Sequence, residues 1–264
     1  MLHEAYLYLT TQCPAHVRGT GYLYEAIALT GRYARNRTNW QPHLENSRKF
    51  VLSAAERCVD RELIVVLGAG LLLDIPLNEL SDMFREVMLL DIVFLPGIRR
   101  ALKKYDNVRL VEHDLTGVAK RLYRGRDLPE AAPAVPRIME WAGLVVSLNI
   151  LSQLAVVPRE YIKNHLKGID IGQLDAWCRH IVSAHYESMR SLSCPVCLVS
   201  DFRYTLRDSQ GLALEQGSTI EGIELPEPDV CWDWDIAPLG ELTRSYSRML
   251  DVGAWHLKSG KTIL

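Results

Sequence analysis

The strongest constraint on the fold of this chain is a short apolar run followed directly by glycines. Residues 63–67 read Leu-Ile-Val-Val-Leu, and Gly-Ala-Gly follows at once at 68–70. About twenty residues later, a second apolar run at 87–90 ends in Asp91. A buried strand followed by glycines lets a ligand approach the backbone, and a carboxylate after the next strand can accept hydrogen bonds from both hydroxyls of a ribose. The pair predicts a site for a nucleotide-type cofactor.

Size and charge set broad limits on the class of protein. The chain has 264 residues and 48% hydrophobic residues, which is enough for one large α/β domain or for a core domain with a helical appendage. Its 30 basic and 32 acidic residues give a net charge of -2, so the overall balance does not attract a polyanion or a membrane surface. Nucleic acid binding is therefore unsupported.

The first residues and the cysteines indicate the compartment. Residues 1–12 lack the basic start and apolar stretch of an export signal, and no segment has 18 uninterrupted apolar residues. We expect a cytoplasmic protein without a membrane anchor, and its six cysteines then stay reduced. Cys194 and Cys197 have the spacing of a zinc knuckle, but no second pair follows, so we predict core thiols, with a metal or redox role as the alternative.

From residue 63 onward, short apolar runs alternate with amphipathic stretches, as in a parallel sheet covered by helices on both faces. Strands are predicted at 63–67, 87–92, 108–112, 143–149 and 195–200. Helices are predicted at 77–86, 96–105, 116–124, 158–166 and 172–192. Two later runs, 230–236 and 249–258, have no helix between them and predict an antiparallel hairpin at the sheet edge.

Two segments outside this alternation, one near the N-terminus and one at residues 210–229, have patterns of their own. Residues 21–35 and 44–59 show helical spacing and are separated by a polar joint at 35–42 that contains a proline. They predict an N-terminal helical cap, so residues 1–60 form the cap and residues 61–264 the core domain. Residues 210–229 are rich in Gly, Glu and Pro and predict a surface loop.

The glycine loop favours a cofactor without phosphates. It holds two glycines rather than three, and six apolar or acidic residues separate it from the next predicted helix. A dinucleotide site needs a helix N-terminus close behind the glycines, and Asp74 would repel a pyrophosphate. A nicotinamide-dependent oxidoreductase remains an alternative that rests on Gly68, Gly70 and Asp91.

The third strand brings a second acid to the same edge of the sheet. Asp114 can accept a hydrogen bond from the exocyclic amine of a base while apolar neighbours clamp the ring, or it can cap the helix that follows Thr116. His113 either touches the base or forms part of the wall. Two other pairs of residues are assigned to packing. Trp232 and Trp234 lie on one half-buried strand. His180 and His185 lie on different faces of one predicted helix, so they are not expected to bind a metal together.

From about residue 63 to its end, the chain resembles the class I S-adenosylmethionine-dependent methyltransferases. The resemblance implies a Rossmann-like α/β fold, a seven-stranded mostly parallel sheet with a C-terminal antiparallel hairpin. The N-terminal helical extension is similar to that of bacterial members with unassigned substrates. The implied cofactor is S-adenosylmethionine, and no metal is implied. The implied cofactor-binding residues are Gly68, Ala69, Gly70, Asp91, Ile92, His113, Asp114, Leu115 and Leu148.

Two features depart from that family pattern. The chain has no acid within the glycine strand and a GxG loop in place of GxGxG. Asp74 either substitutes for the missing acid or is a surface or capping residue. Asn149 ends the fourth strand and either aligns a substrate through its side-chain carbonyl or satisfies the backbone of a turn. It is not followed by the Pro-Pro-aromatic sequence of amine-methylating nucleic-acid enzymes, which argues against base methylation.

We therefore predict a methyltransferase that transfers the methyl group in line to a small-molecule acceptor, with Asn149 as the single candidate for a catalytic residue. The alternative is a non-catalytic protein that binds S-adenosylmethionine or S-adenosylhomocysteine as a sensor or a subunit. The N-terminal helices are predicted to cover the cleft, with Arg35, Arg37, Trp40 and His43 as candidate lining residues. The sequence indicates no oligomeric state.

Overall fold

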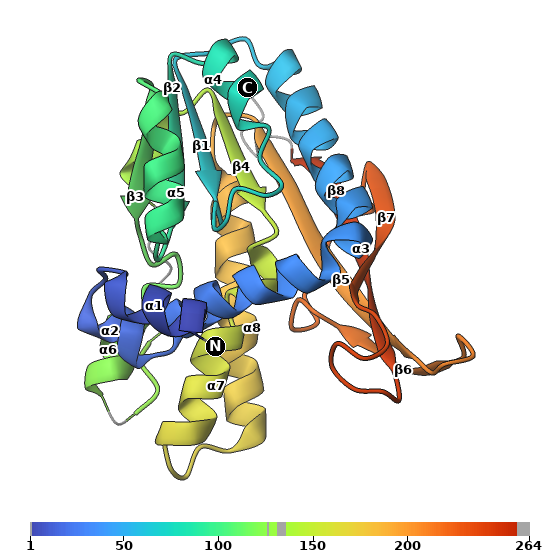
Figure 1. The fold of residues 1–264 in the computed structure, drawn as a ribbon. Helices are drawn as coiled ribbons and strands as arrows, with labels where there is room; N and C mark the ends of the chain where they lie inside the picture. Colours follow the sequence, from blue (N-terminus) through green and yellow to red (C-terminus); the bar gives the residue numbers. More distant parts are fainter. Residues whose placement is uncertain (1, 126, 131–135, 258–264) are drawn as a thin grey trace.

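The computed structural model describes residues 2–125, 127–130 and 136–257. A mixed eight-stranded sheet forms the centre, with helices on both faces (Figure 1). The strands are β1 (Leu63–Leu67), β2 (Glu86–Asp91), β3 (Val108–Glu112), β4 (Leu144–Leu148), β5 (Val196–Arg207), β6 (Ala213–Ser218), β7 (Val230–Ala237) and β8 (Ser247–Leu257). The helices are α1 (Leu2–Thr10), α2 (Ala15–Gly19), α3 (Tyr22–Arg57), α4 (Leu77–Met83), α5 (Pro96–Ala101), α6 (Ala119–Arg124), α7 (Val156–His165) and α8 (Ile171–Ser191), with short 3-10 turns at Leu102–Lys104, Arg137–Trp141 and Leu151–Gln153.

The sheet topology confirms the predicted fold class. Seven strands lie in the order β3-β2-β1-β4-β5-β8-β7, and the first five pair in parallel. The order reverses between β1 and β4, because the chain moves outward from β1 to β3 and then returns to the other side of β1. In open parallel sheets of this kind, ligands bind at the carboxyl ends of the strands where the order reverses. The ends of β1 and β4 thus mark the expected crevice.

Both faces of the parallel strands are apolar, as their continuous hydrophobic runs predict. All five residues of β1 are buried. Val65 packs in one core cluster with Ile181 of α8 and Leu122 of α6, whereas its neighbour Val66 packs in a second cluster with Val51 of α3 and Leu80 of α4. The two cores hold the carboxyl edge of the sheet in place.

The C-terminal half is antiparallel and more elaborate than predicted. The predicted hairpin is present as β7 and β8, with β8 inserted between β5 and β7. The prediction of a loop over residues 210–229 is wrong in part, because β6 pairs there with the extended end of β5. Five of the six β6 residues are exposed, so no buried alternation marks the strand in the sequence. Residue 258, the last of the predicted 249–258 strand, lies outside the described residues.

The N-terminal region corrects a second prediction. In place of two helices with a polar joint, α3 runs through 36 residues and bends at Asn36, whose backbone leaves the helical region. Pro42 lies inside the helix, where it removes one backbone hydrogen bond. Continuity is favoured because the stretch after the bend buries Trp40, His43 and Leu44. Neither α1 nor α2 was predicted.

Figure 1 shows the N-terminal half of α3 crossing the molecule at the carboxyl ends of the parallel strands, while its C-terminal half runs beside the sheet. The helix is fixed to the distant strand β7 by polar contacts. Trp40 Nε1 donates to the carbonyl of Ile236 at 3.0 Å, and Asn39 donates to Asp235 at 2.7 Å. The N-terminal extension is thereby held over the predicted crevice. None of the helices in the described part of the chain combines the length and hydropathy required to cross a bilayer.

Candidate functional site

A crevice at the carboxyl edge of the sheet consists of three adjoining cavities of about 40, 230 and 180 Å³. Gly68 and Gln153 line all three, so the cavities adjoin one another at these residues. The smallest lies at the ends of β2 and β3, the middle one beneath the start of α3, and the third among β4, β7 and the kinked part of α3. Taken together they fall within the ~300–1,000 Å³ typical of pockets for small organic ligands.

The glycine loop can only be built from glycine at its first position. Gly68 has φ of +78°, and a Cβ there would lie 2.7 Å from both Ile150 Cβ and the Leu148 carbonyl oxygen. Gly70 also has positive φ, at +40°. Ala69, between them, is 1% exposed and packs into the core. The close approach of the loop to β4 explains the Gly-Ala-Gly sequence and leaves the backbone as the wall of the crevice.

Asp91 is fixed at the centre of the crevice by the backbone. Its Oδ2 accepts from the N–H of Gly70 and its Oδ1 from the N–H of Ile92, both at 2.7 Å. Burial raises the pKa of Asp91, and these backbone donors oppose that effect. The side chain lines the 40 and 230 Å³ cavities, and an ionised carboxylate has about four acceptor positions, so capacity for a ligand remains. Asp91 therefore lines the crevice, and its contact with a ribose stays a prediction.

The end of β3 forms the far wall of the same crevice. His113, Asp114 and Leu115 line the 40 Å³ cavity together with Ile92. Asp114 accepts from the Thr116 backbone and hydroxyl through Oδ1, and from the N–H of Ala119 at the start of α6 through Oδ2. Asp114 thus accepts from the first N–H of α6 from outside the helix, while Val118 occupies the N-cap position, and a contact to a base stays a prediction.

The end of β4 carries the other predicted residues. Leu148 is 1% exposed and lines the 180 Å³ cavity. Asn149 follows with φ of +50°, and its side-chain nitrogen lies 2.6 Å from Asp74 Oδ2 and 3.2 Å from His43 Nε2. The segment after the glycine loop, the end of β4 and α3 therefore meet at Asn149. Burial raises the pKa of Asp74 to about 6.

Aromatic rings close the 180 Å³ cavity on the side of α3 and β7. His43 and Trp234 stack with ring centroids 3.8 Å apart, and Trp40 meets Trp234 edge to face at 5.3 Å. His43 is 1% exposed, and burial lowers its pKa to about 3, so the ring is neutral. Sequence reasoning named Trp40 and His43 as candidates but assigned Trp232 and Trp234 to packing alone. It missed Asp201, a buried acid at the end of the predicted fifth strand, which also lines this cavity and whose position after an apolar run was the available signal.

Two of the three arginines within residues 32–37, Arg35 and Arg37, do not line the crevice. Arg35 is paired with Glu241, with 2.6 Å between Nη2 and Oε1, and its side chain is 58% exposed. Arg37 is exposed and does not line the three cavities. Arg32, in contrast, lines two of them and is paired with Glu25 at 3.0 Å.

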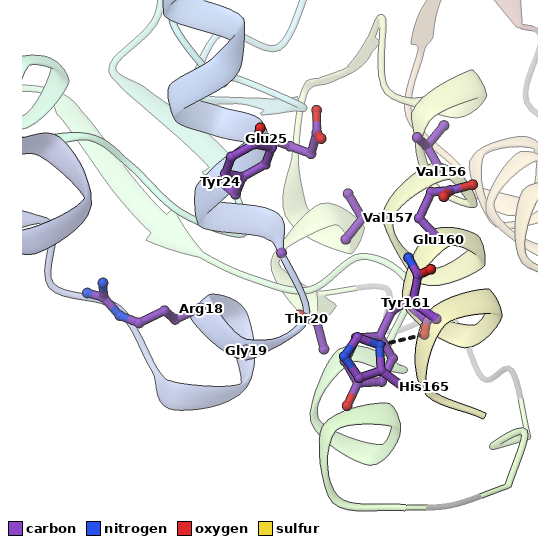
Figure 2. Close-up of a pocket in the computed structure, with 12 residues that line it drawn as sticks. Arg18, Gly19, Thr20, Tyr24, Glu25, Val156, Val157, Glu160, Tyr161 and His165 are labelled. Atoms are coloured by element: carbon purple, nitrogen blue, oxygen red, sulfur yellow. Dashed lines mark hydrogen bonds between the residues drawn. The ribbon is translucent and has the colours of Figure 1, made fainter. Parts of the chain in front are cut away.

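A fourth cavity, of about 250 Å³, adjoins the crevice at the start of α3 and α7. Figure 2 shows Tyr24 and Glu25 facing it from α3, and Val156, Val157 and Glu160 from α7. Glu25, Val156 and Val157 also line the 230 Å³ cavity, so the two spaces meet at these side chains. This fourth cavity lies between the start of α3 and α7.

Among the described residues no group of three or more His, Cys, Asp or Glu side chains could hold a metal ion. All six cysteines are free thiols. His185 is buried, and its Nε2 lies 3.0 Å from the hydroxyl of Ser147 on β4, which is a structural contact.

No protein-family model and no curated protein matches this chain. Among solved structures, a DhpI–SAM–HEP complex is similar, with 10% identity, a TM-score of 0.35, and coverage of 91% of this chain and 99% of the other. A precorrin 8w decarboxylase of Methanobacterium thermoautotrophicum has 14% identity, a TM-score of 0.27, and coverage of 78% and 88%. A putative type II methyltransferase from Anaeromyxobacter dehalogenans has 10% identity, a TM-score of 0.31, and coverage of 80% and 96%. With TM-scores below 0.5, these likenesses carry no weight for function.

Proposed function

We propose that this protein is an S-adenosylmethionine-dependent methyltransferase with a small-molecule acceptor. One observation carries the proposal: Asp91 is tied to the glycine-loop backbone at Gly70, yet it faces the crevice where the strand order reverses. In this reading Asp91 accepts from the ribose hydroxyls. The base lies among Ile92, His113 and Leu115, beside Asp114, and the amino-acid end of the cofactor passes over residues 68–70 toward Leu148.

The loop after the glycines favours this cofactor over a dinucleotide. The first helix after Gly70 begins at Leu77, so no helix N-terminus lies directly behind the glycines to meet a phosphate. Asp74 lines the same cavity as Gly70 and adds a carboxyl group where phosphate oxygens would need donors. A sulfonium cofactor has no phosphate to place there.

The acceptor is placed in the 180 Å³ cavity beside Asn149. Trp40, His43 and Trp234 cover this space from α3 and β7, and its small volume fits a small molecule rather than an open trough for RNA. On this proposal residues 1–60 act as a cap on the 61–264 core. The cap excludes water and shapes the acceptor pocket.

When bound, the cofactor supplies a methyl group already activated by a positively charged sulfur. The protein therefore has to bind, orient and shield the two reactants rather than form a covalent intermediate. Asp91 and the glycine loop fix the nucleoside, Asn149 lies at the junction of the cofactor and acceptor cavities, and the aromatic cover restricts the acceptor to an in-line approach.

Calorimetry tests the proposal directly. We expect S-adenosylmethionine and S-adenosylhomocysteine to bind and NAD not to bind. Asp91→Ala should weaken this binding, whereas Asp82→Ala, which replaces an exposed acid on α4, is the matched control and should bind as wild type does. Binding of NAD alone would overturn the proposal in favour of an oxidoreductase.

Turnover separates an enzyme from a binding protein. Incubation with S-adenosylmethionine and pools of small-molecule acceptors, followed by mass spectrometry, should show S-adenosylhomocysteine formed only in the presence of an acceptor. Tight cofactor binding with no methyl loss across all pools would instead support the sensor or subunit.

A further inference from the structure

Four side chains from distant parts of the sequence form a line of polar contacts beside the acceptor cavity. Trp232 Nε1 lies 3.1 Å from His43 Nδ1, and His43 Nε2 lies 3.2 Å from the side-chain nitrogen of Asn149. That nitrogen lies 2.6 Å from Asp74 Oδ2. The side-chain oxygen of Asn149 is buried without a partner. Trp232 belongs to β7 and His43 to α3, Asn149 directly follows β4, and Asp74 lies in the segment between Gly70 and α4.

Trp232 fixes the tautomer of His43. An indole nitrogen carries a hydrogen and can only donate, so Nδ1 of His43 must accept. The ring is stacked on Trp234 and buried, and burial keeps it neutral. A neutral imidazole carries one hydrogen, which is then on Nε2. His43 therefore presents a donor to Asn149.

This donor conflicts with an amide nitrogen at the same place. Two N–H groups cannot hydrogen-bond to each other, and the oxygen and nitrogen of an amide are assigned from the hydrogen bonds around them. Placing the oxygen of Asn149 between His43 and Asp74 removes the conflict. In this orientation the group of Asn149 that lacks a hydrogen-bond partner is the NH2 group rather than the carbonyl oxygen.

Asp74 must then carry a proton. Two oxygens 2.6 Å apart share a hydrogen, and 2.6 Å is within the usual O–H···O range of ~2.5–3.0 Å. The charge of Arg48 acts on Asp74 through space and favours the carboxylate, while Arg48 Nη1 donates to the carbonyl of Leu73. A hydrogen bond from Asn149 would stabilise the carboxylate, whereas one accepted by Asn149 stabilises the acid.

We propose that His43 is a positioning residue which, together with a protonated Asp74, holds the side-chain oxygen of Asn149 between them and leaves its NH2 group for a ligand atom with free lone pairs. The link to methyl transfer rests on the function proposed above. The hydrogen-bond assignment itself belongs to the free protein. It reverses the sequence expectation that Asn149 presents its carbonyl, and it makes Asp74 a neutral donor rather than a substitute for the missing strand acid.

Spectroscopy on the free protein tests the assignment without any cofactor. Nitrogen-15 NMR should show His43 as the Nε2–H tautomer at pH 7, and Trp232→Phe should mix the tautomers. Infrared spectra should show a protonated-carboxyl band at pH 7 that Asp74→Asn removes. An Nδ1–H tautomer in wild type, or a spectrum that Asp74→Asn leaves unchanged, would overturn the proposal. Absence of S-adenosylhomocysteine binding would leave these results intact and count against the proposed function alone.

Affinity for S-adenosylhomocysteine tests the positioning role, with cooperative thermal unfolding as the check on folding. His43→Gln and Asp74→Asn each keep a donor toward Asn149, whereas His43→Leu and Asp74→Leu do not. We expect each leucine variant to bind about tenfold more weakly than its amide counterpart, as for loss of one partner of a buried hydrogen bond. If Asp74→Asn and Asp74→Leu lose affinity equally, Asp74 acts as a carboxylate and the proposal is wrong.

Discussion

The two halves of the crevice are built in different ways. The nucleoside half is formed mainly by the ends of β1, β2 and β3, and its predicted cofactor-binding residues Gly68, Asp91, Ile92, His113 and Asp114 lie at the end of a strand or within two residues after it. The acceptor half brings together α3, the glycine loop, β4 and β7, so that His43 meets Asn149 across 106 positions and Trp232 across 189. The first half is a local pattern repeated along a parallel sheet. The second depends on how a helical extension packs against the last hairpin.

We expect the largest effect on ligand binding and stability from a substitution in the nucleoside half. Gly68→Val places a branched side chain at φ of +78°, where a Cβ already comes within 2.7 Å of the backbone. We expect loss of measurable S-adenosylhomocysteine binding and a decrease in the free energy of unfolding of at least ~2 kcal/mol, measured by calorimetry and urea unfolding.

Gly97→Ala on α5 is the control for this prediction, because a Cβ at Gly97 meets nothing within 4 Å. Its stability should match wild type or exceed it by up to ~1 kcal/mol. Wild-type binding by Gly68→Val would show that the glycine loop does not touch the ligand.

The next effect is a pH dependence in the acceptor half. The pKa of Asp74 is raised from 3.8 to about 6 in the native state, so its favourable contribution is complete below pH 3.8 and is lost as the pH rises through about 6. Wild type should therefore lose up to about 3 kcal/mol of unfolding free energy relative to Asp74→Asn over that window. Urea unfolding between pH 4 and 8 measures the difference.

The pH at which that difference levels off sharpens the comparison. Levelling near pH 6 would show that Asn149 donates to Asp74 and would contradict the proposed assignment, whereas levelling above pH 7 agrees with the reversed amide. A constant difference across the range would show that Asp74 has the same pKa in the native and unfolded states.

The sequence predicts the nucleoside half of the crevice better than the acceptor half. Apolar runs located the parallel strands, and residues directly after them, such as Asp91 and Asp114, could be placed at one edge of the sheet. His43 and Trp234 could be recognised only as members of a helix and a strand, because their contact requires the packing of α3 on β7. Strand β6 was not predicted because five of its six residues are exposed, so its sequence has no alternation of buried and exposed positions.

A moderate effect tests the ribose contact. Asp91→Ala removes two backbone hydrogen bonds and the predicted hydroxyl contacts, so S-adenosylhomocysteine affinity should fall by about 1–3 kcal/mol or more. Asp91→Asn keeps one acceptor oxygen and should lose less. Titration calorimetry of both variants beside Asp82→Ala gives the comparison, and equal affinity in all three would remove Asp91 from the site.

The smallest effect concerns the attachment of the extension. Arg35→Ala breaks an ion pair to Glu241 in which Arg35 is mostly exposed, so the unfolding free energy should decrease by less than ~1 kcal/mol. Cofactor affinity should stay unchanged, because Arg35 does not line the crevice. A large loss of affinity would instead place this arginine, named as a candidate from the sequence, at the ligand.

A crystal structure of the S-adenosylhomocysteine complex tests the central claim most directly. We predict the ribose hydroxyls within hydrogen-bond distance of the Asp91 carboxylate, the adenine beside Ile92 and Leu115, and the thioether sulfur facing the cavity beside Asn149. A nucleoside bound away from the ends of β1 and β2, or an Asp91 carboxylate that contacts only the protein in the complex, would contradict it.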